Sequence, residues 1–564
     1  MTPPEGKLNG LLWRRRALRR LLRPGARPEE SFLPPIPIPD PTSGKLDHPG
    51  PGFEYRDGIV NLKGWVAFDS GSPVSRVEAE LDDVPIGRAR IGLPRTDVDE
   101  TKTLPMGLSS GFEHSVEIVA ALPDGERVGA KELRVVATAI DGERFEFDPV
   151  PVFLRPVPTR PTELELDVPP PPRAPEPRGS ALRVLVFTHQ LTLGGAQLYL
   201  LDLIGELRRR DVEMTVVSLV DGPLHDELDS LGIPVHLTSI ATMERLDAHV
   251  GRVAELTAWA SGGDFDVVFV NTATSGASFG AEVAKALGLP AVWAIHESFS
   301  PLLLWADLRP AVRERTEVTL GQAAYAVFEA DATRRIFEPL VESDRCLTIP
   351  YGVDLRPIER ERAKLDISAA RREAGFTDDE MIILCVGTVE PRKAQVQLAQ
   401  AFGLVAGEHP GARLVFVGTR KGDPHTEELE DVVADSPVGS RIELIPVSPD
   451  VQTWYAIADV LACASDVESL PRTVLEAMLW ETPVLATSVF GIPELIEDGV
   501  NGWLCEPRDL GALAEGLDRV MSTGESERRQ LAVAARSLVE ERHDLPRYAD
   551  HVLDVLNRAT GTTE

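Results

Sequence analysis

The sequence predicts an α/β protein in which two doubly wound domains stand in tandem behind a smaller all-β domain. Three observations support this fold class. From residue 181 onward, apolar runs alternate with stretches of helical periodicity, as in a parallel sheet covered by helices on both faces. The alternation occurs in two series, 181–352 and 353–540. Residues 53–154 instead contain short segments of alternating polarity between turn sequences, as antiparallel strands do.

The length and composition are those of a globular protein with several domains. A chain of 564 residues is too long for one hydrophobic core and predicts about three or four domains. The net charge of −31 argues against nucleic acid as a partner, because phosphate binding needs a basic face. The four cysteines show neither CxxC nor metal-ligand spacing, which favours a reduced, cytoplasmic setting. No apolar run reaches the roughly 18 residues that span a bilayer.

Residues 1–52 are predicted to be a basic segment followed by a proline-rich spacer, "FLPPIPIPDP". Residues 7–27 contain eight lysines or arginines and no acidic residue. Four leucines there would share one side of a helix: Leu11, Leu18, Leu21 and Leu22. Such a helix would make a peripheral contact with an anionic membrane, which would place the protein at the inner face of the membrane. The alternative is a solvated tail, and the sequence leaves both open.

Residues 53–154 contain the segments "GIVNLKGWVAF", "SRVEAELDDVPIGRARI", "SVEIVAAL" and "ELRVVATAIDGERFEF". Short alternating strands with turns between them predict a β-sandwich of immunoglobulin type. We predict that Trp65 belongs to the core of this sandwich, with a sugar-stacking role as the alternative. Residues 155–180 are rich in proline and predict a stiff, extended linker.

The first α/β series, 181–352, is predicted to be Rossmann-like. It opens with the apolar run "ALRVLVFT", which is typical of a buried parallel strand. The helix predicted next has four apolar residues on one face: Leu200, Leu203, Ile204 and Leu207. Further strands are predicted at "VEMTVVSLV", "FDVVFVN", "AVWAIHE" and "AAYAVFEA". No GxGxxG motif occurs, which argues against an ordinary NAD site.

The second series, 353–540, repeats this pattern, with strands predicted at "MIILCVGT", "RLVFVG", "RIELI", "DVLACAS" and "TPVLAT". Two such domains in tandem leave a cleft between them, which the carboxyl ends of both sheets face. Residues 541–564 are predicted to form a C-terminal helix that packs back on the first α/β domain.

The stretch "SDVESLPRTVLEAM" is the main candidate for a binding site. Glu468 follows a buried strand and precedes a helix that we expect to begin with Pro471, whose missing N–H costs nothing there. Leu470 offers no side-chain cap, so backbone N–H groups at the helix start would be free to bind a phosphate. Glu468 and Glu476 would then flank a diphosphate and accept hydrogen bonds from hydroxyl groups. The alternative is a helix with two solvated glutamates.

Further candidates are predicted at the same strand ends. Arg392 and Lys393 follow the first strand of the second series, where cations would neutralise a diphosphate. Gly194 and Gly195 occupy the first strand–helix turn, and glycines there let the backbone approach a ligand closely. His296 ends another strand, and the sequence alone explains it equally well as a hydrogen-bonded loop residue.

Residues 181 to about 560 resemble the retaining glycosyltransferases of the GT-B fold, in the family called group 1 or family 4 (GT4). The matching residues and segments are Gly194–Gly195, His296, "PRK", "ESLPRTVLEAM", "TPVLAT" and "GIPELIEDGVNG". The resemblance implies a bacterial, hexosyltransferase-type enzyme of polysaccharide or glycoconjugate biosynthesis. Such an enzyme moves a sugar from a nucleotide-diphosphate sugar to a carbohydrate, lipid-linked or other hydroxyl acceptor.

The resemblance also implies roles for single residues. Glu468 would contact hydroxyl groups of the donor sugar, and Glu476 would contact the ribose. Lys393 and the backbone amides around Ser469 and Leu470 would hold the diphosphate, while the glycine turn closes over the donor. Pro471, which has no backbone N–H, belongs to the same donor-binding segment. His296, Glu468 and Lys393 would form the catalytic set. No metal and no cofactor is expected for this family, and retention would proceed by same-face attack rather than through a covalent intermediate.

Two positions depart from the family pattern. The family often has an arginine after the glycine of "VGT", where this chain has Thr388, and we predict that Arg392 supplies the missing charge to the donor site. Phe490–Gly491 stands where a double glycine is usual, which would narrow the donor-sugar pocket.

Two other functions remain open from the sequence. One is another GT-B enzyme, such as a nucleotide-sugar epimerase, which shares the diphosphate cleft. The other is a carbohydrate-binding or scaffold protein with a degenerate GT-B unit. Product analysis with and without an acceptor separates the first from a transferase, and transfer by residues 178–564 alone would exclude the second.

Overall fold

The computed structural model describes residues 43–55, 58–68, 70, 72–93, 111–117, 121–123, 127–155, 181–238, 245–274, 278–448 and 450–561. The basic segment 7–27 lies outside the described residues, so its contact with a membrane stays a prediction. Nearly all of the predicted linker lies outside them as well. Within the described part of the chain, no helix is both long and apolar enough to cross a membrane.

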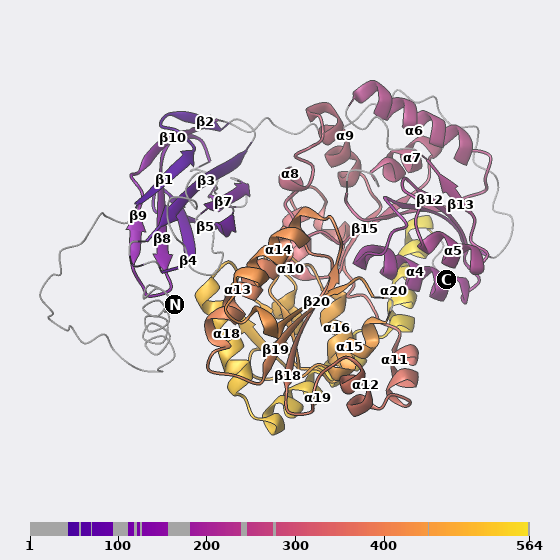
Figure 1. The fold of residues 1–564 in the computed structure, drawn as a ribbon. Helices are drawn as coiled ribbons and strands as arrows, with labels where there is room; N and C mark the ends of the chain where they lie inside the picture. Colours follow the sequence, from indigo (N-terminus) through magenta and orange to yellow (C-terminus); the bar gives the residue numbers. More distant parts are fainter. Residues whose placement is uncertain are drawn as a thin grey trace, which may run out of the picture.

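The first part of the described chain forms two sheets, which we call the two-sheet domain (residues 43–155) (Figure 1). The strands of one sheet, in spatial order, are β1 (Ser43–His48), β3 (Ile59–Ala67), β7 (Gly111–Glu117) and β6 (Arg90–Leu93). Those of the other are β2 (Phe53–Tyr55), β10 (Val150–Leu154), β8 (Gly129–Ala139), β4 (Val74–Leu81) and β5 (Val84–Arg88), with β9 (Arg144–Glu146) beside β8. The first strand therefore lies in the segment predicted to be a spacer.

Residues of both sheets meet in one apolar cluster, which includes Leu62 from β3, Val77 from β4 and Leu133 from β8. The prediction for Trp65 is wrong. In β3 the side chains of Leu62 and Val66 point to the core, so Trp65, one position away from Val66, faces the other side and is partly exposed. The immunoglobulin type of this domain stays a prediction.

The first α/β domain is built on a parallel sheet with the spatial order β13-β12-β11-β14-β15-β16-β17. Its strands are β11 (Arg183–Thr188), β12 (Glu213–Ser218), β13 (Val235–Leu237), β14 (Val267–Asn271), β15 (Ala291–Ile295), β16 (Tyr325–Phe328) and β17 (Cys346–Thr348). Its helices are α4 (Gly195–Arg208), α5 (Leu224–Ser230), α6 (Leu246–Ala260), α7 (Phe279–Leu287), α8 (Pro301–Leu304), α9 (Pro310–Gly321), α10 (Asp331–Phe337) and the 3-10 turn η3 (Ser343–Arg345). The four apolar residues predicted on the first helix are all buried.

The second α/β domain has the parallel order β20-β19-β18-β21-β22-β23. Its strands are β18 (Met381–Val386), β19 (Ala412–Thr419), β20 (Ile442–Pro446), β21 (Val460–Cys463), β22 (Val484–Thr487) and β23 (Trp503–Cys505). Its helices and 3-10 turns are α11 (Leu355–Arg362), α12 (Ile367–Glu373), η4 (Pro391–Lys393), α13 (Gln395–Val405), α14 (Pro424–Asp435), η5 (Gly439–Arg441), α15 (Val451–Ile457), α16 (Arg472–Leu479), α17 (Ile492–Leu495), α18 (Leu510–Ser522) and α19 (Glu525–Arg542).

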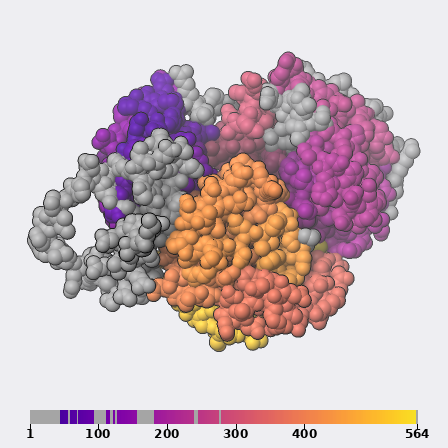
Figure 2. All heavy atoms as spheres, viewed as in Figure 1, coloured from indigo at the N-terminus to yellow at the C-terminus, as the bar shows by residue number. Residues whose placement is uncertain are grey.

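The last helix, α20 (Leu545–Thr560), returns to the first α/β domain and packs against α4 (Figure 1). Arg210, just after α4, fixes this contact: its Nε donates to Asp550 at 2.7 Å and its Nη2 to the carbonyl oxygen of Pro546 at 2.8 Å. The two α/β domains meet along a continuous boundary (Figure 2). The chain thus crosses between them twice, once near Val353 and once near Asp544, which form a backbone bridge.

Candidate active site

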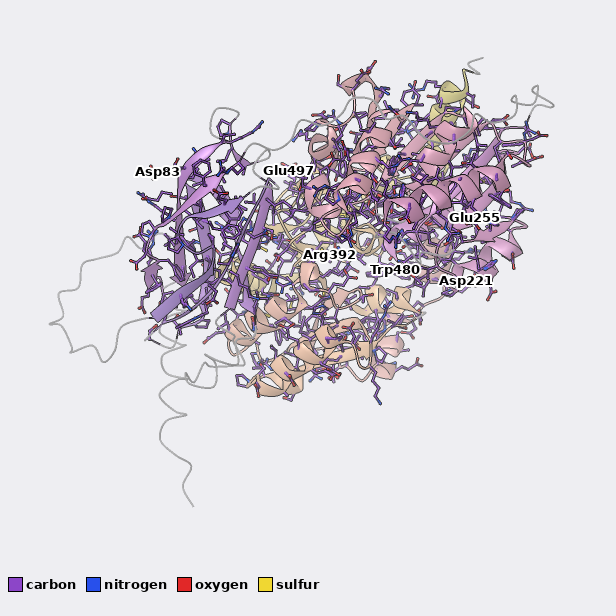
Figure 3. The ribbon with its side chains drawn as sticks, turned by 90° about the horizontal axis from the view of Figure 1, so that it is seen from above. Asp83, Asp221, Glu255, Arg392, Trp480 and Glu497 are labelled. Atoms are coloured by element: carbon purple, nitrogen blue, oxygen red, sulfur yellow. The ribbon has the colours of Figure 1, made fainter. Side chains whose placement is uncertain are left out.

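Both parallel sheets change direction at their first strand, because β11 lies between β12 and β14, and β18 lies between β19 and β21. Loops that leave such a switch point form a crevice at the carboxyl edge of the sheet, where α/β domains bind ligands. The candidate residues follow strands at these edges: Gly194 and Gly195 follow β11, His296 follows β15, Lys393 follows β18 and Glu468 follows β21. In Figure 3, Arg392 lies near the middle of the molecule, where the α/β domains meet.

Glu468 is the centre of a buried charge cluster in the loop between β21 and α16. Its Oε1 lies 3.4 Å from Nζ of Lys393 and 3.2 Å from Nη1 of Arg392, and the Ser465 hydroxyl donates to it at 3.0 Å. Burial alone would raise the pKa of Glu468, but Lys393 and Arg392 outweigh it and hold the pKa below its usual value. The carboxylate is therefore ionised at neutral pH, although only 12% of the side chain is exposed.

The two cations come from the short turn η4, which follows β18. Gly387 directly follows the strand with a φ of 137°, and a Cβ there would lie 3.0 Å from Nζ of Lys393. A side chain at Gly387 would therefore displace the lysine from Glu468. Arg392 makes a further ion pair with Glu390 at 2.9 Å, so its charge is shared between two carboxylates. The structure thus brings both predicted cations together with Glu468.

The start of α16 differs from its prediction in one detail. Pro471 is the N-cap, with φ −71° and ψ 119°, and the first helical residue is Arg472. The Pro471 carbonyl accepts from the Val474 amide at 3.0 Å, and no side chain caps the helix. Several amides at this end have no acceptor among the described residues: those of Ser469, Leu470, Arg472 and Thr473. Free donors at a helix start can bind an anion, as the sequence predicts.

Glu476 lies on the next turn of α16 but faces an arginine of its own helix. Its Oε1 accepts from Nε of Arg472 at 2.7 Å. Arg472 also donates from Nη1 to Asp202 of α4 at 2.7 Å, and its guanidinium lies over the Tyr199 ring at 5.3 Å. Glu476 is therefore placed where the two α/β domains meet, and its contact with a ribose stays a prediction.

His296 is held on both ring nitrogens. Nδ1 bonds to the Glu329 carboxylate and Nε2 lies 2.9 Å from Oδ1 of Asn271. Burial would lower the pKa of His296, but Glu329 outweighs it and raises the pKa above its usual value. Asn271 also donates from Nδ2 to the Ala196 carbonyl at 3.2 Å, which ties His296 to the first turn of α4. The structure thus favours a charged, hydrogen-bonded imidazole.

Sequence reasoning missed Glu329 and Asn271. Asn271 is the last residue of β14, and Glu329 follows β16 directly. A polar residue at the end of a buried parallel strand is a usable signal, because neighbouring strand ends meet at one edge. That signal would have indicated the edge of the sheet at which these residues lie. It would not have predicted their contacts with His296, because those depend on how the loops pack.

The glycine turn lies at the start of α4. Gly194 is the N-cap with an extended backbone, and Gly195 is the first helical residue. No side chain caps this helix, and a Cβ added at Gly195 would meet nothing within 4 Å. The space beside Gly195 is therefore open, whereas a Cβ at Gly194 would collide with the Gln197 side chain. The close approach of a ligand to this turn stays a prediction.

Polar contacts hold the two α/β domains together around these residues. The Glu494 carboxylate of α17 accepts from the backbone amides of Asp331 at 2.9 Å and Ala332 at 2.7 Å. The Ser469 hydroxyl bonds to that of Thr333 at 2.9 Å. Both contacts connect the start of α10 to the second α/β domain, so the halves are closed against each other in this structure.

Among the described residues, no group of three or more His, Cys, Asp or Glu side chains is arranged to hold a metal ion. The cysteines Cys346, Cys385 and Cys463 are buried, and Cys505 is partly exposed. Burial raises the pKa of Cys385 to about 12. We therefore assign no chemistry to these thiols.

Family profiles match both α/β domains. The profile described as "Glycosyl transferases group 1" matches residues 366–538, and "Glycosyltransferase Family 4" matches residues 193–356. Among curated relatives, a D-inositol 3-phosphate glycosyltransferase of Thermomonospora curvata is 27% identical and covers 61% of this chain and 86% of its own. Another of the same name, from Xylanimonas cellulosilytica, is 29% identical and covers 65% and 92%.

Solved structures show the same arrangement of the two α/β domains. Anabaena Alr3699/HepE in complex with UDP and glucose has a TM-score of 0.58 and 22% identity, and the match covers 67% of this chain and 100% of that one. WaaG, a glycosyltransferase involved in lipopolysaccharide biosynthesis, has a TM-score of 0.51 and 19% identity, and covers 66% and 99%. At these identities the likeness establishes the fold.

Proposed function

Because the chain belongs to the group 1, family 4 glycosyltransferases of the GT-B fold, we propose that it moves a sugar from a nucleotide-diphosphate sugar to a hydroxyl acceptor with retention of configuration. The observation that carries the proposal is the contact of Glu468 with Lys393 and Arg392 beside uncapped amides of α16. Cations and free amides in one crevice suit a diphosphate. A carboxylate next to them suits the hydroxyl groups of the attached sugar.

In this proposal, the donor diphosphate lies against the start of α16. Its oxygens accept from the free amides and from Nζ of Lys393, which in the present structure lies against Glu468. Glu468 then accepts hydrogen bonds from the donor sugar, Glu476 from the ribose, and the glycine turn at Gly194 approaches the donor from the first α/β domain. These roles are proposals, supported by the placement of the residues after strands of the two parallel sheets.

The proposed chemistry is same-face attack on the anomeric carbon. The bond between the anomeric carbon and the diphosphate breaks while a new bond forms between this carbon and the acceptor oxygen. An oxygen of the leaving diphosphate takes the proton of the acceptor hydroxyl. Lys393 and the helix amides stabilise the charge that develops on the diphosphate, and His296, whose pKa is raised by its contact with Glu329, borders the reacting groups. The NMR signal of the product's anomeric proton tests retention: an inverted anomer would contradict it.

We propose that transfer needs no metal ion, since Lys393 and Arg392 already supply positive charge where a metal would otherwise neutralise the diphosphate. Transfer should therefore be unchanged after dialysis against EDTA. Loss of activity that returns with a divalent cation would contradict the proposal.

The acceptor is proposed to be a carbohydrate or a lipid-linked hydroxyl compound. The curated relatives are named for D-inositol 3-phosphate, so this compound belongs in the first acceptor screen. The donor base is found by thermal shift with UDP-, GDP-, ADP- and TDP-sugars. A ligand at 100 times its Kd stabilises a protein by about 2.7 kcal/mol, so the cognate donor should raise Tm clearly.

The central test is the loss of transfer in Lys393→Ala and Glu468→Ala. Removing one donor that stabilises developing charge typically lowers the rate about 100- to 1,000-fold. Lys364→Ala is a matched control, because Lys364 is exposed and pairs with Glu361 on the surface. Near wild-type turnover in both site variants would refute the assignment, provided that circular dichroism shows intact folds.

A further inference from the structure

A cavity of about 1180 Å³ lies where the two-sheet domain and both α/β domains meet. The two-sheet domain supplies Arg88, Arg90 and His114 to its wall. The second α/β domain supplies Arg392, which also contacts Glu468 through Nη1 at 3.2 Å. The cavity therefore lies beside the proposed donor site. The two-sheet domain forms one of its walls, which the two α/β domains alone would not provide.

The two-sheet domain is fixed firmly enough to form a wall. The Ser75 hydroxyl donates to Asp509 at 2.7 Å, and Nη1 of Arg508 donates to the Arg88 carbonyl at 2.8 Å. Gln397 of α13 donates to the Ile91 carbonyl at 2.9 Å. One apolar cluster also runs from the strands of this domain into α13 and α18. Contacts of all these kinds favour a fixed interface over a tethered module.

The cavity wall is basic, although the chain as a whole carries a net charge of −31. Five arginines line it, Arg88, Arg90, Arg335, Arg392 and Arg508, against three acidic residues. One of these acids loses its charge already in mildly acidic solution, because burial raises the pKa of Asp466 to about 6 despite the nearby Arg508. A concave basic wall on an acidic protein concentrates anions.

Two of these arginines have bonding capacity to spare. Nε of Arg90 is buried and has no hydrogen-bond partner among the described residues, so a ligand would meet the terminal nitrogens of this side chain, which is 25% exposed and whose Nη2 lies 3.4 Å from Glu113. Arg335 of α10 is exposed and makes no hydrogen bond or ion pair with any described residue. The exposed guanidinium of Arg335 and the partly exposed guanidinium end of Arg90 fit carboxylate or phosphate oxygens that enter the cavity.

We propose that this cavity is the acceptor site, and that Arg90 of the two-sheet domain and Arg335 of the first α/β domain recognise an acceptor that carries a phosphate or a carboxylate. The inference rests on the proposed function, because an acceptor must enter beside the donor sugar. It assigns the two-sheet domain a direct part in substrate binding. Apolar side chains of Leu303, Ile336 and Leu340 line the same cavity, so the anion can belong to a soluble sugar or to a lipid.

The test is calorimetric titration of the full-length protein, saturated with the nucleotide diphosphate that the thermal-shift screen selects. Glucose and glucose 6-phosphate form a matched probe pair that differs by one phosphate. We expect glucose 6-phosphate to bind at least about 10-fold more tightly than glucose, since hydrogen bonds to charged groups are strong. Arg90→Ala and Arg335→Ala should each remove most of this difference, and Arg90→Lys should restore part of it.

Arg134→Ala is the control, because Arg134 lies on the two-sheet domain but pairs with Asp83 and Glu132 at its surface. Figure 3 shows Asp83 at the outer edge of that domain, away from Arg392. Equal affinity for the two probes, or unchanged affinity for glucose 6-phosphate in both site variants, would overturn the proposal. Since Arg335 is exposed, its variant stays informative if the Arg90 variant fails to fold.

A further arm identifies the source of the anion. Short-chain dihexanoyl phosphatidic acid, kept below its micelle concentration, replaces the sugar phosphate in the same titration. Tighter binding of this lipid than of glucose 6-phosphate supports a lipid-linked acceptor, and the reverse supports a soluble one. Absence of nucleotide binding by the wild-type protein would instead contradict the proposed function, so the two failures are distinguishable.

Discussion

Arg392 is the residue that we predict to replace the arginine missing at position 388. It lies in η4, pairs with Glu390 and Glu468, and donates to the Val467 carbonyl at 3.3 Å. Thr388, which stands where an arginine is frequent in the family, has no charge to offer the donor. Arg392 reaches Glu468 from the next turn of the chain, which makes it a physically reasonable substitute.

Arg392→Ala should therefore weaken donor binding. One lost charge-assisted contact corresponds to about 1.5–3 kcal/mol, or roughly a 10- to 100-fold higher Kd. Arg392→Lys should restore part of the affinity, because a positive charge returns without the planar guanidinium. Calorimetry with the nucleotide diphosphate measures both, with Arg360→Ala on α11 as an exposed control. Unchanged donor affinity and turnover in Arg392→Ala would show that the idea is wrong.

Asp466 gives a pH-dependent prediction. Burial raises its pKa from 3.8 to about 6 in the folded chain, which means that folding disfavours its charged form. Its contribution to stability is therefore fully present below pH 3.8 and is lost as the pH rises through about 6. Asp466→Asn removes this titration. From pH 4.5 to pH 7.5, the Tm of the variant should therefore rise relative to that of the wild type. The corresponding change in the free energy of unfolding is at most about 3 kcal/mol.

Differential scanning calorimetry across this pH range measures the effect. Asp229→Asn on α5 is a control, because that carboxylate is exposed. A Tm difference between Asp466→Asn and wild type that stays constant from pH 4.5 to 7.5 would contradict the assignment of a raised pKa.

At the scale of elements, α10 is capped from another domain. Its N-cap is Ala330, which has no capping side chain, and Glu494 of α17 accepts from the amides of Asp331 and Ala332 instead. By contrast, α14 is capped locally by Asp423. A cap contributes about 0.5–2 kcal/mol, and here the same contact also holds the two α/β domains together.

Glu494→Ala should therefore increase hydrogen exchange at the start of α10 while leaving α14 unchanged. The expected increase is roughly 2- to 30-fold, which corresponds to the cap energy. Hydrogen–deuterium exchange with mass spectrometry of peptides covering 329–337 and 423–435 measures it. Equal protection of the first peptide in both proteins would mean that the contact does not stabilise the helix start.

The strands and helices that the sequence predicted well are those with continuous apolar runs, such as β14, in which all residues are buried. Three-residue strands such as β13, β17 and β23 were missed, since so few residues carry no periodicity. Trp65 was misplaced because a tryptophan in an alternating strand fits either face. Pro471 was predicted to be the first helical residue, but its ψ of 119° is extended, which makes it the N-cap. The proline ring fixes φ and leaves ψ free, so the sequence alone does not distinguish the two positions.

The sequence predicted the site residues that lie in one continuous segment, such as Glu468 and the uncapped start of α16. It did not predict the residues from other segments that contact them. Asn271 and Glu329 meet His296 only after three parallel strands assemble, and the Arg472–Asp202 contact joins residues of two domains. The wall that the two-sheet domain adds to the cavity has no signature in the sequence at all, since Arg90 reads as an ordinary strand residue.

At the scale of the whole molecule, the closed contact of the two α/β domains depends partly on a few polar links. Asp202→Ala combined with Glu494→Ala removes two of them and should give a more open protein without donor. Small-angle X-ray scattering should show a larger radius of gyration than for wild type, and the nucleotide diphosphate should reverse part of the change. An unchanged radius would mean that apolar packing alone sets the closure.

The central claim is that the start of α16 and Lys393 hold the donor diphosphate, with Glu468 at its sugar end. A crystal structure with the nucleotide sugar that the thermal-shift screen selects tests this most directly. The account predicts diphosphate oxygens within about 3.2 Å of amides in residues 469–473 and of Nζ of Lys393, with Glu468 on a sugar hydroxyl. A diphosphate bound away from α16, or a Glu468 carboxylate turned from the donor, would contradict it.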